Sequence, residues 1–116
     1  MTYEAVMDLA RETELPFAYD HFAEGESPDP PFLCFLYPEN VPIGADDTVY
    51  YQLHHLDIEL YTDRKMPDIE AQIEAVFDRH GLYYDKSEVW IPEEKLYEVL
   101  YSTEVIYEQE QDQVQP

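Results

Sequence analysis

The 116-residue sequence is poor in cationic residues and in cysteine. It has 6 Lys and Arg against 27 Asp and Glu, so its formal net charge is −21 at pH 7. Binding to nucleic-acid phosphates needs clustered Lys and Arg, so the composition argues against a protein that binds DNA or RNA directly. The single cysteine, Cys34, excludes an intramolecular disulfide framework and a site built from several thiolates. It also fits a reducing compartment.

Long apolar runs and glycine-rich loops are lacking as well. The longest apolar run, Phe32–Tyr37, has six residues, whereas a membrane-spanning helix needs about twenty. Met1–Ala5 offers neither a basic region nor an apolar core, so we expect no secretory signal. The three glycines are scattered and form no phosphate-binding loop. A hydrophobic content of 45%, with 15% aromatic residues, nevertheless indicates a folded, soluble domain and not a disordered acidic chain.

Periodicity predicts two helices. In Thr2–Glu14 apolar residues recur at intervals of three and four, and Thr2 is suited to cap the helix. A second helix is predicted from Pro67, a favoured first residue, to the residues just before Gly81, a favoured residue after a helix end. The apolar stripes are formed by Tyr3, Val6, Leu9 and Ala10 in the first helix, and by Ile69, Ile73, Val76 and Phe77 in the second.

Between and after the helices, β-forming residues predict four strands and a short fifth one. Two proline- and glycine-containing stretches, Phe17–Pro31 and Glu39–Asp47, are interpreted mainly as loops, the first of them acidic. The predicted strands are Phe32–Tyr37, Thr48–Tyr61, Leu82–Trp90 and Lys95–Tyr107, with Phe17–Phe22 as a short edge strand.

The longest of these segments changes its pattern half-way. In Thr48–Tyr61 the apolar residues stand at odd positions as far as Leu53 and at even positions from Leu56 onward. Such a change moves the apolar set to the other face of a regular strand, so we predict a β-bulge or sharp bend near His54–His55. A strand of this length can pack into the core at one end and extend beyond it at the other.

The order α-β-β-α-β-β predicts an α+β fold with a mostly antiparallel sheet of four strands, or five with Phe17–Phe22. Residues 1–107 form one domain, and the polar residues 108–116 are expected to be a disordered tail. Lys95–Tyr107 is apolar on both sides. We therefore expect the helices to cover one face of the sheet and a neighbouring chain to cover part of the other.

The sequence gives little support for catalysis or for a cofactor. Cys34 lies in the most apolar strand, where a thiol is usually inert. Adjacent residues such as His54 and His55 point to opposite faces of a regular strand, so they could chelate one ion only with the help of the predicted bend. No calcium-loop or His-Glu-x-x-His motif is present. We expect no catalytic residue, no metal and no cofactor. Two of the many acids could meet in the fold for general acid–base chemistry, so a small enzyme of that kind stays open as the least supported reading.

Two features of the composition point to contacts with other proteins. A free domain of this size is usually soluble with a net charge of about 2–8, and −21 adds self-repulsion that destabilises the compact state. Tyrosine is also enriched at protein interfaces, and the chain has eleven. The candidates for such contacts are Tyr50, Tyr51, Tyr83, Tyr84, Tyr101 and Tyr107.

Several strings resemble small proteins encoded among the tail genes of Gram-positive prophages. They are Leu15–Phe22, Phe32–Pro38, Leu56–Asp63, Glu88–Ile91 and Lys95–Tyr101. The predicted order of elements is also similar to that of tail-terminator, or tail-completion, proteins of long-tailed phages. That resemblance implies a hexameric ring that caps the tail tube, stops its polymerisation and presents a surface to the head connector, with no catalytic or metal-binding residues.

The resemblance further implies a location at the head–tail junction of the virion, reached after assembly in the host cytoplasm. Its partners would be copies of itself, a tail-tube protein and a head-connector protein, with no membrane. Six copies carry 6 × 21 = 126 formal negative charges, which would repel passing DNA without binding it. The acids expected to face the bore are Glu24, Glu26, Asp29, Asp46 and Asp47.

Two other functions fit the same sequence features. A DNA-mimic inhibitor uses surface carboxylates to imitate phosphates and so to occupy a DNA-binding host enzyme. Another head–tail connector, such as a head-closure or adaptor protein, would share most of the expected properties of a tail terminator.

Overall fold

The computed structural model describes residues 2–37, 40–45 and 48–107, with 40–45, 48–54, 106 and 107 described by their backbone alone. Two helices and six strands follow one another along the chain. They are α1 (Tyr3–Glu12), β1 (Phe17–Tyr19), β2 (Phe32–Leu36), β3 (Asn40–Ala45), β4 (Thr48–Thr62), α2 (Pro67–Arg79), β5 (Tyr84–Ile91) and β6 (Leu96–Tyr107).

The main sheet has the strand order β1-β2-β4-β6-β5, and β3 pairs with β4 outside this path. Only the pairing of β1 with β2 is parallel among the described strands. β6 occupies one edge of β4, while β2 and β3 follow one another along the other edge. The α+β class with a mostly antiparallel sheet, predicted from the sequence, is therefore confirmed. The short strand predicted within Phe17–Phe22 is present as β1.

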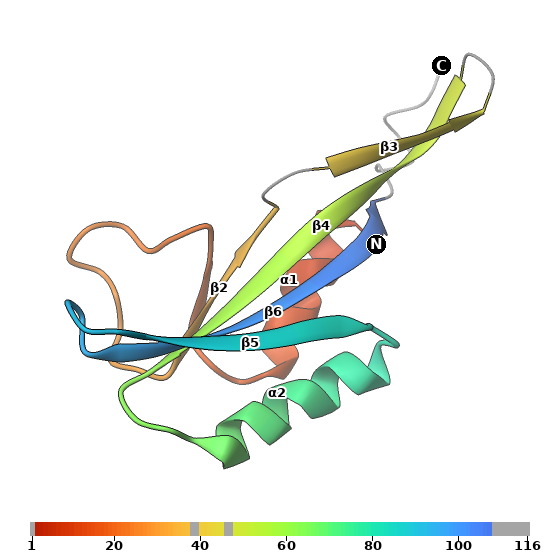
Figure 1. Ribbon diagram of the computed structural model, residues 1–116. Helices are drawn as coiled ribbons and strands as arrows, with labels where there is room; N and C mark the ends of the chain where they lie inside the picture. Colours follow the sequence, from red (N-terminus) through yellow and green to blue (C-terminus); the bar gives the residue numbers. More distant parts are fainter. Residues whose placement is uncertain (1, 38–39, 46–47, 108–116) are drawn as a thin grey trace.

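The β3–β4 hairpin forms an arm that reaches away from the helices (Figure 1), and the molecule measures 49 × 28 × 26 Å. The prediction that Thr48–Tyr61 extends beyond the core is thus confirmed. The prediction of a loop over Glu39–Asp47 is wrong, because Asn40–Ala45 is a strand paired with β4. Pro42 had suggested a loop, but proline is tolerated in a strand when that strand lies at the edge of a sheet.

The irregularity of β4 lies further along the arm than predicted. The β3–β4 register shifts between Ile43 and Gly44, where β4 contributes one extra residue. The ladder between β4 and β6 runs without a shift from the pair Gln52–Tyr107 to the pair Thr62–Tyr97. A bulge near His54–His55 is therefore wrong, since that stretch belongs to the unbroken ladder.

Both helices begin as the sequence predicts, and α2 also ends as predicted, whereas α1 ends at Glu12, two residues before the predicted Glu14. The Thr2 hydroxyl accepts a hydrogen bond from the Ala5 amide at 3.0 Å and so caps α1. Pro67 opens α2, and Gly81 follows it with a φ of +69°, a left-handed conformation that glycine adopts without strain. Within the described residues neither helix has the length and apolarity that a membrane crossing needs.

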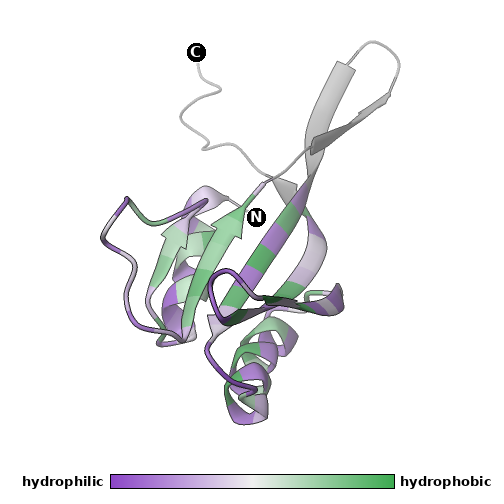
Figure 2. Ribbon diagram, turned by 60° about the vertical axis from the view of Figure 1, so that its left-hand side comes forward, coloured by the Kyte–Doolittle hydropathy of each residue, from purple (hydrophilic) through white to green (hydrophobic). Residues whose placement is uncertain are grey.

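The helices cover one face of the sheet and form the hydrophobic core with it. Phe77 of α2 packs edge-to-face on Tyr84 and Tyr101, with ring centroids 5.4 and 5.1 Å away. In Figure 2 the apolar strand β2 is green throughout, in contrast to the mostly purple segment that leads into it. The core includes Val6, Leu9, Leu33, Phe35, Leu56, Ile58, Leu60, Ile73, Phe77, Val99 and Tyr101.

Candidate interaction surface: the open face of the sheet

The sheet face turned away from the helices is the open face. Residues directly opposite in a ladder point to the same face, so the strand registers arrange its side chains in rows across β2, β4, β6 and β5. The three central rows are Phe32, Tyr61, Glu98 and Val89; then Cys34, Glu59, Leu100 and Ser87; then Leu36, Asp57, Ser102 and Asp85. His55 and Glu104 continue the face on one side, and Leu96 and Ile91 on the other.

A group of carboxyl side chains lies at the centre of the open face. Asp57 and Glu59 alternate with core residues along β4, and Glu98 lies diagonally across from Glu59 on β6. The Tyr61 hydroxyl donates a hydrogen bond to Glu59 at 2.9 Å. Burial raises the pKa of Glu59 to about 7; the bond from Tyr61 opposes this rise, and the Glu98 and Asp57 carboxylates add to it.

Cys34 lies beside these acids on β2 and has the properties expected of an inert thiol. It is 5% exposed. Burial, together with the nearby carboxylates of Glu59, Asp20 and Glu98, raises the pKa of its thiol to about 11. A thiol held protonated in this way is a poor nucleophile.

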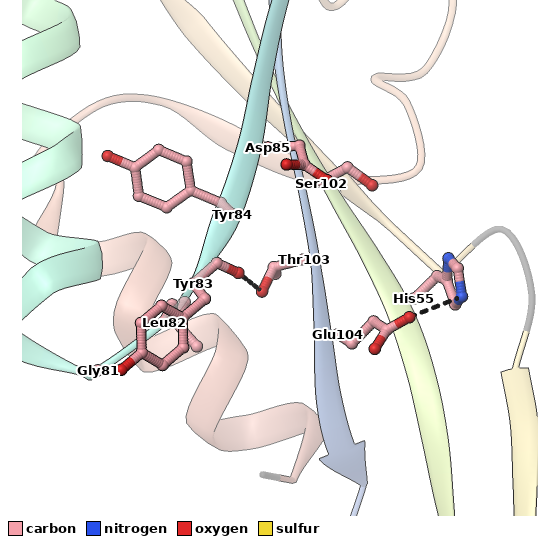
Figure 3. Close-up of a pocket in the computed structure, with 9 residues that line it drawn as sticks. All are labelled: His55, Gly81, Leu82, Tyr83, Tyr84, Asp85, Ser102, Thr103 and Glu104. Atoms are coloured by element: carbon pink, nitrogen blue, oxygen red, sulfur yellow. Dashed lines mark hydrogen bonds and ion pairs between the residues drawn. The ribbon is translucent and has the colours of Figure 1, made fainter.

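A hollow of about 510 Å³ opens at the margin of the open face, where β5 begins and β6 continues past it (Figure 3). Three of its lining residues, His55, Ser102 and Glu104, belong to two cross-strand pairs. Ser102 donates to Asp57 at 2.9 Å, and His55 lies 3.2 Å from Glu104. Each is a lateral contact between direct register partners. The geometry resembles ordinary sheet pairing more than the relay of nucleophile, base and orienting acid that hydrolysis needs.

His21 and His80, the other histidines whose side chains are described, are paired with acids at the surface. His21 lies 2.7 Å from Asp20, and His80 lies 2.9 Å from Glu12. Among the described residues no three His, Cys, Asp or Glu side chains are grouped so that they could hold a metal ion.

Three of the acids predicted to face a bore lie together in the segment before β2. Glu24, Glu26 and Asp29 are all exposed there. Asp46 and Asp47 lie outside the described residues. The loop acids are thus available for the predicted role, and they are on a different element from the central acids of the open face.

The six candidate tyrosines have very different positions. Tyr83 is 92% exposed at the turn before β5, and Tyr84 is partly buried against α2. Tyr101 needs correction as a contact residue: it is 0% exposed in the core, and its hydroxyl donates to Glu74 at 2.8 Å. The side chains of Tyr50, Tyr51 and Tyr107 lie outside the described part.

Neither Glu59 nor Glu98 stands out in the sequence as a candidate site residue. The available signal was the alternation in β4, where acids at 57 and 59 interleave with three apolar residues that are fully buried. That pattern places Asp57 and Glu59 together on the face opposite the core. The contribution of Glu98 depends on the β4–β6 register, which periodicity does not specify.

Comparison with known proteins adds no assignment. No model of a protein family matches the chain, and no curated protein sequence matches it.

Proposed function

We propose that the protein is a non-catalytic structural component of a long-tailed phage, which caps the tail tube and joins it to the head connector. It acts as one subunit of a ring, and its partners are its own copies, the tail-tube protein and the connector. The observation that carries the proposal is the β3–β4 arm, which leaves the body of the domain along the longest dimension of the molecule.

The composition of the arm favours contact with another chain. Residues 40–54 include Val41, Ile43, Tyr51 and Leu53 and contain no Lys or Arg. An apolar segment that projects from a domain is disfavoured in water unless another chain covers it. A neighbour in a ring is a natural cover, because heterologous contacts between identical subunits close into rings.

The opposite end of the strand order offers a complementary surface. β5 is an edge strand that pairs with β6 alone among the described strands, and its residues Asp85–Trp90 are exposed. An exposed edge presents unpaired backbone groups and is a template for adding a strand. The arm of one subunit and β5 of the next therefore supply the two unlike halves of a repeating contact.

Electron microscopy of phage particles tests the proposal. We expect a phage that lacks this gene to produce overlong or headless tails, and normal tails attached to heads would contradict the role. A sharper test complements the deletion with the arm variant Tyr51→Asp/Leu53→Asp. It should melt within a few degrees of the parent, since the backbone of the arm reaches away from the helices, and yet fail to restore normal tails. The control Ala23→Asp/Ser27→Asp adds the same charge in the exposed loop before β2 and should complement.

The surplus of carboxylates also suits a DNA-mimic inhibitor, but such a protein needs no projecting apolar arm. Competition with DNA for a host restriction enzyme separates the two functions. Inhibition that persists in the Tyr51→Asp/Leu53→Asp variant would favour mimicry over the terminator role.

A further inference from the structure

We infer that the open face is a docking site for a basic amphipathic helix of another protein, with its aliphatic side chains on Leu36 and Leu100 and its Lys or Arg side chains on the central acids. This goes beyond the proposed function and does not depend on it. A connector, a tube protein or a host protein would each be recognised by the same chemistry.

The apolar content of the face suits a helix. Helices already cover the other face of this sheet, and a second layer on the open face would complete a three-layer arrangement of a common kind. Leu36 and Leu100 are half-buried on neighbouring rows, and Val89 at the β5 margin is 52% exposed. A partner that removes the remaining surface of these side chains from water would be stabilised by the hydrophobic effect.

The charge of the face selects a basic partner. Asp57, Glu59 and Glu98 occupy the centre, and Asp85 and Glu104 lie toward the margins. None of the side chains that the strand registers place on the open face is Lys or Arg. A partner that covered this face with apolar groups alone would bury uncompensated carboxylates, which is strongly unfavourable. Ammonium or guanidinium groups would offset that penalty.

The groups that face Glu59 come from three strands. Cys34 lies next to it on β2, Asp57 and Tyr61 are on its own strand, and Glu98 is on β6. All four are neutral or anionic. A cation placed against Glu59 is therefore attracted by Asp57 and Glu98 and repelled by none of the four, and it favours the ionised form of the carboxyl.

A second copy of this chain does not supply the cations. Five of its six Lys and Arg residues already form ion pairs within the subunit. Arg11 pairs with Asp8, Arg64 with Asp63, Lys65 with Glu70 and Glu88, Arg79 with Glu12, and Lys86 with Glu70 and Glu74. Contact between two open faces would bring like charges together, so the charge balance points to a different polypeptide.

The test is a titration of the full chain with a synthetic peptide of about eighteen residues, or five helical turns. The probe carries a leucine stripe flanked by lysines, and a second peptide carries glutamates in place of the lysines. Binding is followed by NMR from the methyl groups of Leu36 and Leu100. We expect saturable shifts with the lysine peptide and none with the glutamate peptide.

Two protein variants, each of which loses two carboxyl groups, locate the site. Glu59→Gln/Glu98→Gln removes two acids from the open face, and Glu24→Gln/Glu26→Gln removes two from the exposed loop. We expect the first to bind the lysine peptide roughly tenfold more weakly, as the loss of about 1.4 kcal/mol implies, and the second to bind within about twofold of the parent. Melting curves check that both variants are folded.

Three results would overturn the inference. The first is that the methyl resonances do not move with the lysine peptide. The second is that both variants bind this peptide equally weakly, which would mean attraction to net charge alone. The third is that the glutamate peptide binds as tightly as the lysine peptide. Self-association of the chain that perturbs the same methyl groups would assign the face to a second copy instead.

Discussion

The carboxyl group of Glu59 is held in an environment that favours its protonated form. Burial, with Glu98 and Asp57 nearby, raises its pKa to about 7 from an ordinary value of 4.5. In the pH range between these values the folded state binds more protons than the unfolded state, so the free energy of unfolding falls as pH rises. The contribution is fully present below pH 4.5 and is lost as pH rises through 7.

We therefore predict that Glu59→Gln becomes more stable relative to the parent by about 1 kcal/mol between pH 5 and pH 8, after allowance for the partial exposure of the side chain. Urea unfolding at several pH values measures this difference, and comparing variant with parent at each pH cancels the other titrating groups. Glu24→Gln, in the exposed loop, is the control and should keep a constant offset. A constant offset for Glu59→Gln as well would show that the open face does not perturb this carboxyl.

At the residue scale, the sequence indicated which side chains are exposed to solvent better than it indicated which side chains lie close to one another. The loop acid Glu24 is exposed, as its place in a predicted acidic loop indicated, and Tyr83, predicted as a contact residue within a strand, is exposed in the turn before β5. Tyr101 was predicted as a contact residue, although its position on the apolar side of β6 already favoured the core. The approach of Glu59 to Glu98 joins residues far apart in the chain, and only the strand register reveals it.

At the element scale, β5 is attached to the domain by its ladder to β6 and by an ionic clamp to α2. Lys86 of β5 lies 2.8 Å from Glu70 and 2.7 Å from Glu74, both on α2. Lys65 lies 2.8 Å from Glu70 and also pairs with Glu88 of β5. Glu70 is 7% exposed, and although burial alone would raise its pKa, the two lysines hold that pKa below its ordinary value.

Lys86→Met should lower the free energy of unfolding by about 1–3 kcal/mol, because it leaves Glu70 buried with one cation in place of two. Hydrogen exchange should rise first in the amides of β5, since an edge strand opens more easily than the central β4. Arg11→Met is the matched control: it removes the same charge from an exposed pair with Asp8 and should cost less than about 0.5 kcal/mol. Equal losses for the two variants would show that the clamp contributes nothing beyond surface charge.

Element boundaries could be predicted wherever local signals determine them. Pro67 is the first residue of α2 and Gly81 lies just beyond its end, so local signals determine both ends, and both agreed with the sequence. β3 was missed because Pro42 and Gly44 are locally loop-forming, whereas the pairing that makes Asn40–Ala45 a strand comes from β4. The change in apolar pattern along β4 correctly indicated an irregularity in this strand, but the predicted position was wrong. The ladder to β6 keeps His54–His55 regular.

For the whole molecule, the balance of charge is the dominant electrostatic feature. With 27 acids and 6 cations, most carboxylates have no cationic partner even if every Lys and Arg is paired. The compact state brings these carboxylates closer together than the unfolded chain does, and their repulsion lowers stability. Salt screens such repulsion, with a Debye length of about 10 Å at 0.1 M.

We predict that the melting temperature rises by about 5 °C between 20 mM and 500 mM NaCl, the shift expected for roughly 1 kcal/mol in a domain of this size. The variant Glu24→Gln/Glu26→Gln/Asp29→Asn removes three loop charges without touching an ion pair that holds the fold. It should melt above the parent at 20 mM NaCl and approach it at 500 mM, because screening makes the removed charges irrelevant. Differential scanning calorimetry of both proteins at the two salt concentrations makes the comparison. A melting temperature that falls with salt would mean that the ion pairs of the clamp outweigh the repulsion among unpaired acids. In that case the surplus charge would not destabilise the folded state. Assembly with a basic partner would then have no charge repulsion to relieve.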